Sequence, residues 1–301
     1  MQRALVDFGA DQSFGKAADK VQEHYGFQYN VSAVRESTLK CAARVADQLE
    51  AEAAKDYRLL PTTHARTVIA EADGSMLCTV FSGPRRGKRP RKWEEIRLAA
   101  AQLQGEQQSV YAASFGSVKE LGRRWGHCAK AAGRQLHSRV HCLGDGAEWI
   151  EQQSQAIFGS RGRYLCDYYH VSQYLAAAAE RCRPKAPHRW RRTQQKRLKR
   201  GAYQLVIQEL ELHREADSTP AQEAPVRAAE RYLKNRVDQL DYAGALAQKL
   251  PIGSGMIESG HKHVLQGRLK LSGAAWLKEN AHSMAQLRVL RANRRWEQIW
   301  N

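Results

Sequence analysis

Apolar residues recur at helical intervals through the first part of the chain, which predicts a helical segment over residues 1–60. One helical stretch, 13–25, is followed by Gly26, a residue that commonly ends helices. A second stretch, 33–54, follows after a short turn. Beyond residue 60 the pattern changes to shorter, β-prone runs, so we expect a different architecture to begin there.

The two N-terminal helices and the short turn between them predict a helix-turn-helix. Its second helix would present Arg35 and Lys40 to a DNA major groove. Any helical hairpin shares this pattern, so simple packing of the two helices is the alternative. The chain starts abruptly within this segment, and we expect the DNA-binding region to be incomplete at its N-terminal end.

Residues 61–182 alternate between β-prone runs and helical patterns. Runs at 67–71 and 76–81 flank Asp73 and Gly74, and an Asp-Gly pair in that position is a signal for a hairpin turn. Further β-prone runs lie at 93–103, at 109–115, before Asp145 and at 164–166, with helical patterns at 117–132, at 148–157 and from 168 to about 182. An antiparallel start followed by strand-helix alternation predicts an α/β fold with an RNase H-like sheet.

The remaining sequence predicts two further segments. Residues 183–250 are expected to form an all-helical, basic insertion, and residues 251–301 to return to the core as C-terminal helices. The insertion opens with a run, 181–200, that holds ten Lys and Arg residues. We expect Arg191, Arg192, Lys196 and Arg197 of this run to contact DNA phosphates, whereas a merely solvated face is the alternative.

Composition narrows the class of partner. The 301 residues carry a formal net charge of +17, with an isoelectric point of about 9.8, and such an excess favours a polyanion, first of all nucleic acid. A basic loop at 82–92 contributes Arg85, Arg86 and Lys88 as further candidate phosphate contacts. No apolar run approaches the length of a membrane span. Six cysteines without CxxC pairs indicate reduced thiols, and we expect a cytoplasmic, nucleoid-associated prokaryotic protein.

Three acids stand beside Gly or Ser at the expected ends of elements: Asp73, Asp145 and Glu258. If they converge, three carboxylates supply hard oxygen ligands for two Mg²⁺ or Mn²⁺ ions. Two such ions promote an in-line displacement at a phosphodiester. Each acid also has a simpler interpretation. Asp73 would sit in a hairpin turn, Asp145 would cap the following helix, and Glu258 would face a helix dipole or pair with Lys262.

Four stretches, EADGSM, LGDGAEWI, CDYYH and PIGSGMIESGHKHVLQGRLKLSGAAW, resemble insertion-sequence transposases of the DDE type. The similarity is to the ISKra group, related to the Mutator-like elements, and it runs from about Val68 to the C-terminus. The resemblance implies that Asp73, Asp145 and Glu258 are the catalytic, metal-binding triad. It also implies that Asp167 and His170 form an accessory pair beside the active site, although Asp167 capping the next helix and His170 packing on it is the alternative.

By this resemblance the protein would be a DNA transposase that cleaves element ends and transfers strands with two Mg²⁺ or Mn²⁺ ions. Its partners would be terminal inverted repeats, target DNA and further copies of itself. The basic residues Lys262, Arg268 and Lys270, around and beyond the Glu258 helix, are candidate contacts to substrate phosphates. His261 and His263 are expected at polar surface positions. A non-catalytic DNA-binding remnant is the alternative from a different class, and a structure-specific nuclease is a third.

Overall fold

The computed structural model describes residues 1–64, 66–81 and 90–300. These residues form a mixed α/β fold with two compact units. Unit 1 comprises Met1–Ser138 and Gly255–Asn301, and unit 2 comprises Arg139–Ser254. Within the described residues, no helix combines the length and the apolar character that crossing a membrane requires.

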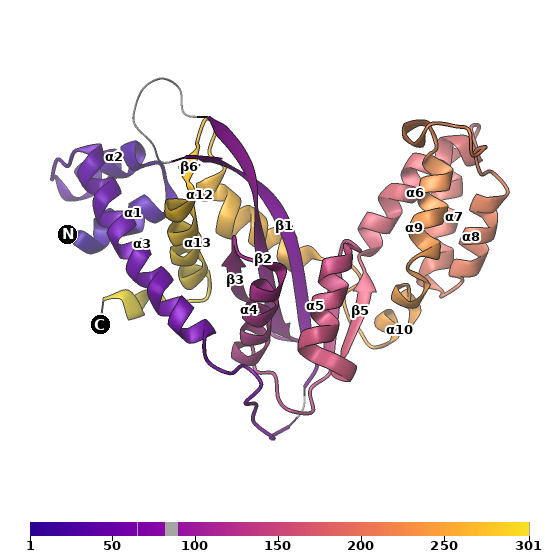
Figure 1. Cartoon of the computed structure of the whole chain (residues 1–301), viewed down its shortest axis with the longest axis horizontal. Helices are drawn as coiled ribbons and strands as arrows, with labels where there is room; N and C mark the ends of the chain where they lie inside the picture. Colours follow the sequence, from indigo (N-terminus) through magenta and orange to yellow (C-terminus); the bar gives the residue numbers. More distant parts are fainter. Residues whose placement is uncertain (65, 82–89, 301) are drawn as a thin grey trace. The chain divides into compact units, whose positions relative to one another are not determined.

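Unit 1 begins with three packed helices (Figure 1): α1 (Gln2–Asp11), α2 (Phe14–Tyr25) and α3 (Val31–Ala53). Ser13 and Asn30 cap α2 and α3 by accepting backbone amide hydrogen bonds, and Gly26, with φ 72°, ends α2. Val21 and Val34 are fully buried in a small apolar cluster between the three helices. The two predicted helices and the turn that joins them are therefore confirmed.

Six strands form one mixed sheet in the order β3-β2-β1-β4-β5, with β6 beside β1. In unit 1, β1 pairs antiparallel with β2, β2 pairs antiparallel with β3, and β6 pairs parallel with β1. In unit 2, β4 and β5 are parallel. The strands are β1 (Val68–Val80), β2 (Arg91–Leu103), β3 (Val110–Ser114), β4 (Val140–Gly144), β5 (Gly162–Cys166) and β6 (Trp276–Leu277).

The predicted hairpin turn at Asp73 and Gly74 is wrong, because β1 runs through both residues as one continuous strand. Asp73 lies opposite Leu98 of β2, and Gly74 lies opposite the next residue along. Apolar residues on both sides of the Asp-Gly pair, Ala72 and Leu77 among them, are buried. Pairing the whole of β1 with β2 buries more apolar surface than a hairpin between the two halves of β1 would. This burial outweighs the local preference of Asp73 and Gly74 for a turn.

Helices from both ends of the chain complete the core of unit 1. Leu98 and Ala100 of β2 share a hydrophobic core with Leu287 and Leu290 of α13. Figure 1 shows α4 across the strands of this unit, and α3 packs along α13. Helical spacing of apolar residues predicts one C-terminal helix from 276 to about 300, but the observed helix is shorter, because β6 precedes it and a 3-10 turn follows it. These elements are α4 (Val118–Ala131), α11 (Gly255–Gly260), a π-helical turn (His261–Gln266), α12 (Gly267–Leu269), α13 (Lys278–Ala292) and η5 (Trp296–Ile299).

Unit 2 places the parallel strands β4 and β5 beside a set of helices. Between residues 183 and 250 the structure has helices and turns but no strand. Leu198, Val206 and Leu233, one from each of three consecutive helices, are fully buried. The helices are α5 (Glu148–Phe158), α6 (Tyr168–Cys182), α7 (Pro187–Lys199), α8 (Tyr203–Glu211), α9 (Pro225–Lys234) and α10 (Tyr242–Ala247).

Candidate active site

Asp73 lies in the middle of β1, on the strand face that also carries Glu71 and Ser75, because alternate residues of a strand share a face. The side chain of Asp73 is 37% exposed, whereas Glu71 is only 1% exposed. Lys270 Nζ donates to Ser75 Oγ at 2.7 Å, so an ammonium lies two residues along the strand from Asp73. Part-exposed oxygen ligands and a nearby cation suit a site for metal and phosphate.

The buried carboxylate of Glu71 holds the helix that carries Glu258. Its Oε2 accepts a hydrogen bond from the Ile257 amide at 2.7 Å. An acceptor at this position satisfies one of the amides that a helix leaves unpaired in its first turn. This contact fixes the first turn of α11 on β1, and the next residue, Glu258, is exposed. The sequence pattern did not identify Glu71, because its partner lies 186 residues away.

His261 follows Glu258 by about one helical turn and touches the strand directly. Its Nε2 lies 3.4 Å from Asp73 Oδ2, and the residue is only 5% exposed. The predicted surface position of His261 is therefore wrong. Burial lowers the pKa of His261 to about 4, against a smaller raising effect from the Asp73 backbone. The imidazole is consequently neutral at pH 7, the state in which histidine binds metals.

Of the two structural interpretations of Glu258, the ion pair with Lys262 is not observed in the described structure, whereas the helix-dipole interpretation agrees with the structure. Glu258 forms no ion pair with Lys262 within the described part of the chain, and Lys262 itself is exposed. Its place in the first turn of α11 does agree with the helix-dipole interpretation. The turn that follows, beginning at His261, is π-helical, a rare form that often occurs at functional sites.

In unit 2, Asp145 follows β4 and precedes α5. Its Oδ1 accepts from the Ala147 amide at 2.9 Å, but the N-cap residue of α5 is Ala147, and α5 has no side-chain cap. Side chains from α9 and from the turn after it donate hydrogen bonds to the backbone at Asp145 and Gly146. Tyr232 donates its hydroxyl to the Asp145 carbonyl at 2.5 Å, and Arg236 donates to the Gly146 carbonyl at 2.7 Å. The helical segment thus fixes the loop that presents Asp145.

Asp167 does cap a helix, and it does more. Its Oδ1 accepts from the amides of Tyr169 and His170, at the start of α6, at 2.5 and 3.0 Å. Its Oδ2 accepts from the Ser254 amide at 2.6 Å and from the Ser254 hydroxyl. The carboxylate is buried, at 2% exposure. Asp167 therefore joins α6 to the loop directly before α11, the helix that carries Glu258.

The imidazole of His170 packs among aromatic rings. Its ring centroid lies 5.6 Å from that of Tyr174 and 5.7 Å from that of Tyr232. Tyr232 is the residue that bonds the Asp145 carbonyl. The contacts of His170 therefore agree with the packing interpretation. They also place His170 next to Tyr232, which holds the backbone at Asp145.

The oxygen donors of Asp73, Asp145 and Glu258 are chemically suited to Mg²⁺ or Mn²⁺. Asp145 and Glu258 form no ion pair with Lys or Arg among the residues described, so their charge is not already neutralised by the chain. As it stands, the described part of the structure brings no group of three or more His, Cys, Asp and Glu side chains into a metal-binding arrangement. The Asp73–His261 pair and Glu258 belong to unit 1, and Asp145 belongs to unit 2.

The predicted DNA contacts occupy different environments. Arg35, Lys40, Arg192, Lys196, Lys262 and Lys270 are exposed, whereas Arg191 and Arg197 are half-buried. Arg197 pairs with Glu209 at 3.4 Å. Arg268 is buried, at 2% exposure, unlike the exposed residues of this set. Arg85, Arg86 and Lys88 lie outside the described residues.

Comparison with known proteins gives one family. The model of the uncharacterised protein family UPF0236 matches residues 131–298, more than half of the chain. That span includes Asp145, Asp167 and Glu258 but not Asp73. No curated protein matches the chain.

Proposed function

The chain belongs to the UPF0236 family, and we propose that it is a DNA transposase of the DDE type, related to the ISKra group. In this proposal Asp73, Asp145 and Glu258 hold two Mg²⁺ or Mn²⁺ ions. The substrate is the end of an insertion sequence, and the products are a cleaved end and a strand joined to target DNA. The sheet supports an RNase H-like assignment, because in that fold the order is 3-2-1-4-5 with antiparallel first strands.

One observation carries the proposal furthest: the helix with Glu258 is held on the strand with Asp73. Glu71 holds the Ile257 amide, and His261 lies against Asp73, so contacts on both sides of Glu258 reach β1. A protein that only binds DNA has no need to fix the helix of an exposed glutamate to the strand of a part-exposed aspartate.

The chain's own residues would prepare the site in three ways. Glu71 and Asp167 position the two ends of the segment that leads to Glu258, through Ile257 and Ser254. Tyr232 and Arg236 fix the loop that presents Asp145. Lys270, beside the strand of Asp73, is placed to contact a phosphate of the strand being cut. The bound metals would supply activation of the nucleophile and stabilisation of the leaving oxygen.

The test is an assay of end cleavage and strand transfer. Purified protein is incubated with a labelled duplex that carries the element's terminal repeat, with Mg²⁺, with Mn²⁺ or with EDTA. The parent should nick or join the duplex only when metal is present. Asp145→Asn keeps the side-chain shape but removes the charge, so this variant should bind DNA without cutting it.

Glu148→Gln is the matched control, because it removes an exposed acid three residues away. This control should cut at the parent's rate. Binding without cleavage by the parent, with either metal, would instead identify a DNA-binding remnant. Cleavage directed by DNA structure, independent of the terminal repeat, would identify a nuclease.

A further inference from the structure

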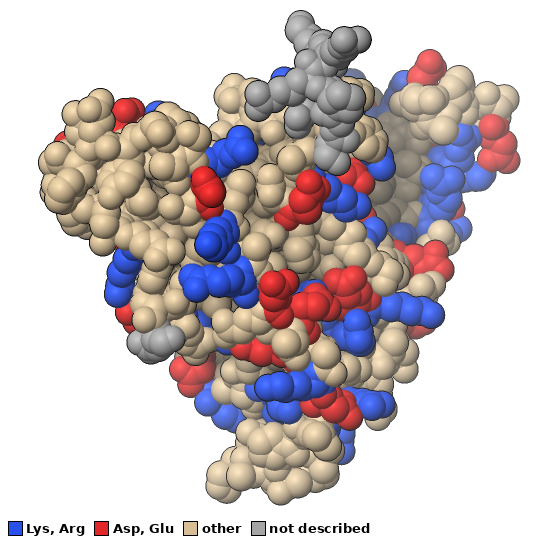
Figure 2. Space-filling model, turned by 60° about the vertical axis from the view of Figure 1, so that its left-hand side comes forward, with Lys and Arg blue, Asp and Glu red and all other residues tan. Residues whose placement is uncertain are grey.

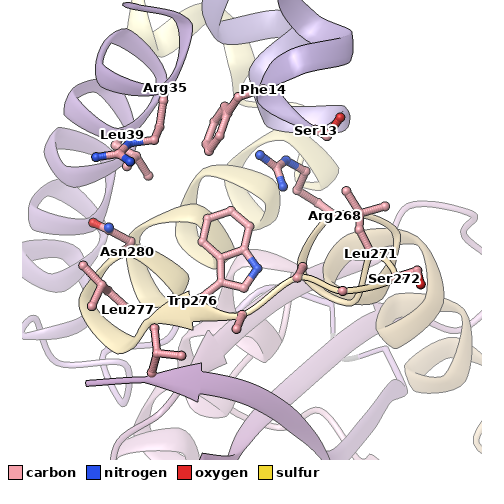
Figure 3. A pocket seen from close by; sticks show the side chains of 14 residues that line it. Ser13, Phe14, Arg35, Leu39, Arg268, Leu271, Ser272, Trp276, Leu277 and Asn280 are labelled. Carbon is pink, nitrogen blue, oxygen red and sulfur yellow. The ribbon is translucent and has the colours of Figure 1, made fainter. Parts of the chain in front are cut away.

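Unit 1 contains a pocket of about 520 Å³ that the triad does not use (Figure 3). The pocket lies between α2, α3 and the chain from 268 to 280. Its volume is in the range of small-molecule sites. All of its lining residues belong to unit 1, and none of the described residues that line it is acidic.

Arg268 lines this pocket as a buried cation that forms no ion pair within the described structure, although the charge of Asp11 acts on it. Its Nε donates to the Gly9 carbonyl at 3.0 Å, and its guanidinium lies 4.5 Å from the Phe14 ring centroid and 4.8 Å from that of Trp276. Nη2 is buried and has no hydrogen-bond partner within the described structure. Burial lowers the pKa of Arg268 to about 10, so the guanidinium is still charged at pH 7.

A buried charge without an ion pair destabilises a fold unless other contacts compensate for it. The two aromatic rings compensate in part, through cation–π contact. They cannot accept the hydrogen bonds of the terminal nitrogens in the plane of the guanidinium. An anion can do so, and a guanidinium is well matched to phosphate or carboxylate oxygens.

Two further features make the pocket electropositive. Arg35 of α3 reaches it from the opposite side, as Figure 3 shows. Ser13 caps the N-terminus of α2 at its rim, where the helix dipole favours negative charge. The walls are largely apolar and include Leu39, Leu271 and Leu277. A bare inorganic anion would leave these walls exposed to water.

We propose that this pocket binds a nucleotide, with its phosphate on Arg268 and its base against the apolar walls, while Arg35 attracts the anion from the opposite side. Ser272 and Asn280, which also line the pocket, supply polar groups for the edge of the base. The nucleotide has two chemically equivalent sources: a free mononucleotide and the 5′-phosphorylated end of a DNA strand. The site goes beyond the proposed transposase activity and does not depend on it.

The test measures binding by calorimetry with the full chain in EDTA, so that no metal-dependent chemistry contributes. The probes are deoxyadenosine 5′-monophosphate, deoxyadenosine and inorganic phosphate. The mononucleotide should bind at least about tenfold more tightly than either part alone, because only the mononucleotide satisfies both the arginines and the walls. Equal binding of phosphate and mononucleotide would overturn the nucleotide assignment, and no binding of any probe would overturn the site.

Two variants locate the binding. Arg35→Ala removes an exposed cation and should weaken mononucleotide binding by about tenfold. Ala275→Phe keeps both arginines but fills the pocket, and should abolish binding. Arg123→Ala is the matched control, since Arg123 is exposed on α4 and does not line the pocket. If Arg35→Ala and Ala275→Phe both bind the mononucleotide as tightly as the parent does, the nucleotide lies elsewhere and the proposal is wrong.

A pair of tetranucleotides, with a 5′-phosphate and with a 5′-hydroxyl, then identifies the source. Tighter binding of the 5′-phosphorylated strand than of the mononucleotide assigns the pocket to a DNA end. Weaker binding assigns it to a free nucleotide. If the parent protein binds the mononucleotide but does not cleave DNA with either metal, the proposed function is refuted and the nucleotide site is not.

Discussion

The contacts of each carboxylate indicate the role of each acidic residue. Glu71 and Asp167 are buried, at 1% and 2% exposure, and their carboxylates accept hydrogen bonds from backbone amides. Asp145 is partly exposed, and one of its oxygens accepts a single amide hydrogen bond. The buried acids therefore support the backbone, whereas the partly exposed Asp145 is free of such a role on its other oxygen, as the proposed metal site requires.

Replacing Asp167 should destabilise unit 2. Asp167→Ala removes the acceptor for the cap of α6 and for Ser254, and leaves their amides without partners. We expect a loss of about 2–4 kcal/mol in the free energy of unfolding, measured with urea. Ser254→Ala removes one of these bonds and should cost about 1 kcal/mol. Asp238→Ala, at an exposed position, should change stability by less than about 0.5 kcal/mol. Equal effects of Asp167→Ala and Asp238→Ala would contradict the assigned contacts.

His141 should make stability depend on pH. Burial lowers its pKa in the folded protein, and Arg163 adds to this effect, whereas the Pro251 carbonyl partly opposes it. An unfolded chain takes up the proton near its ordinary pKa of about 6.5. Below that pH the unfolded state binds more protons than the folded state, so stability falls as pH falls. His141→Gln should reduce the loss of stability between pH 7 and pH 5.5. An unchanged pH dependence would show that His141 does not titrate in this way.

Single residues could be predicted from the sequence only where a local pattern marks them. Asp73, Asp145 and Glu258 each stand beside Gly or Ser, and the sequence marked all three. Glu71 was missed because it sits in an apolar run and its partner lies 186 residues away. His261 was placed at the surface because helical spacing does not show which side of a short helix β1 covers. Long-range contacts decided both cases.

At the scale of elements, the segment from α11 through the π-helical turn links the candidate site to the core. Glu71 holds its first turn and Gly260 lies at its centre. A Cβ atom at Gly260 would come within 2.7 Å of Tyr111 Cε1 and 2.8 Å of Leu98 Cδ2. The absence of a side chain at this position therefore allows the helix to lie close to the sheet.

Two glycine substitutions in α11 should have opposite effects. Gly260→Ala forces the helix away from β2 and should cost about 1–3 kcal/mol of stability. Gly255→Ala meets nothing within 4 Å and should be neutral or stabilise by up to about 1 kcal/mol. Both are measured by thermal and urea unfolding. If Gly260→Ala is as well tolerated as Gly255→Ala, the close packing of α11 on the sheet is wrong.

Most elements could be predicted from periodicity, and the failures have a common cause. The helices α2 to α6 and the strands β2 to β5 lie close to the expected ranges, and residues 183–250 are helical as expected. β1 was divided in two because an Asp-Gly pair signals a turn when only the local sequence is considered. The helix expected at 276–300 loses its first residues to β6, which pairs with β1. In both cases strand pairing overrides local preference.

At the scale of the whole molecule, the charge of +17 is its clearest property. On the face shown in Figure 2, Lys and Arg side chains are interspersed with Asp and Glu and do not form a single uniform patch. Position along the chain is more informative than total charge. Arg192 and Lys196 lie one turn apart on α7, and both are exposed. We expect this face of α7 to contact phosphates.

DNA binding should therefore depend on salt, and α7 should account for part of that dependence. The double variant Arg192→Ala with Lys196→Ala should weaken binding uniformly across sequences and reduce the slope of log K against log salt by about 2. Binding is measured by fluorescence anisotropy from 50 to 300 mM salt. Lys20→Ala with Arg123→Ala provides a control of equal charge. Equal slopes for the two double variants would exclude a specific role for α7.

The proposed function requires Asp73, Asp145 and Glu258 to act together as one metal site. The most direct test measures single-turnover cleavage of the element's end by Asp73→Asn, Asp145→Asn, Glu258→Gln and the triple variant. Groups that act as a unit are strongly non-additive, so each single change should lower the rate by at least about 10³-fold, and the triple variant should be little slower than any single one. A parental rate in any single variant would contradict the claim.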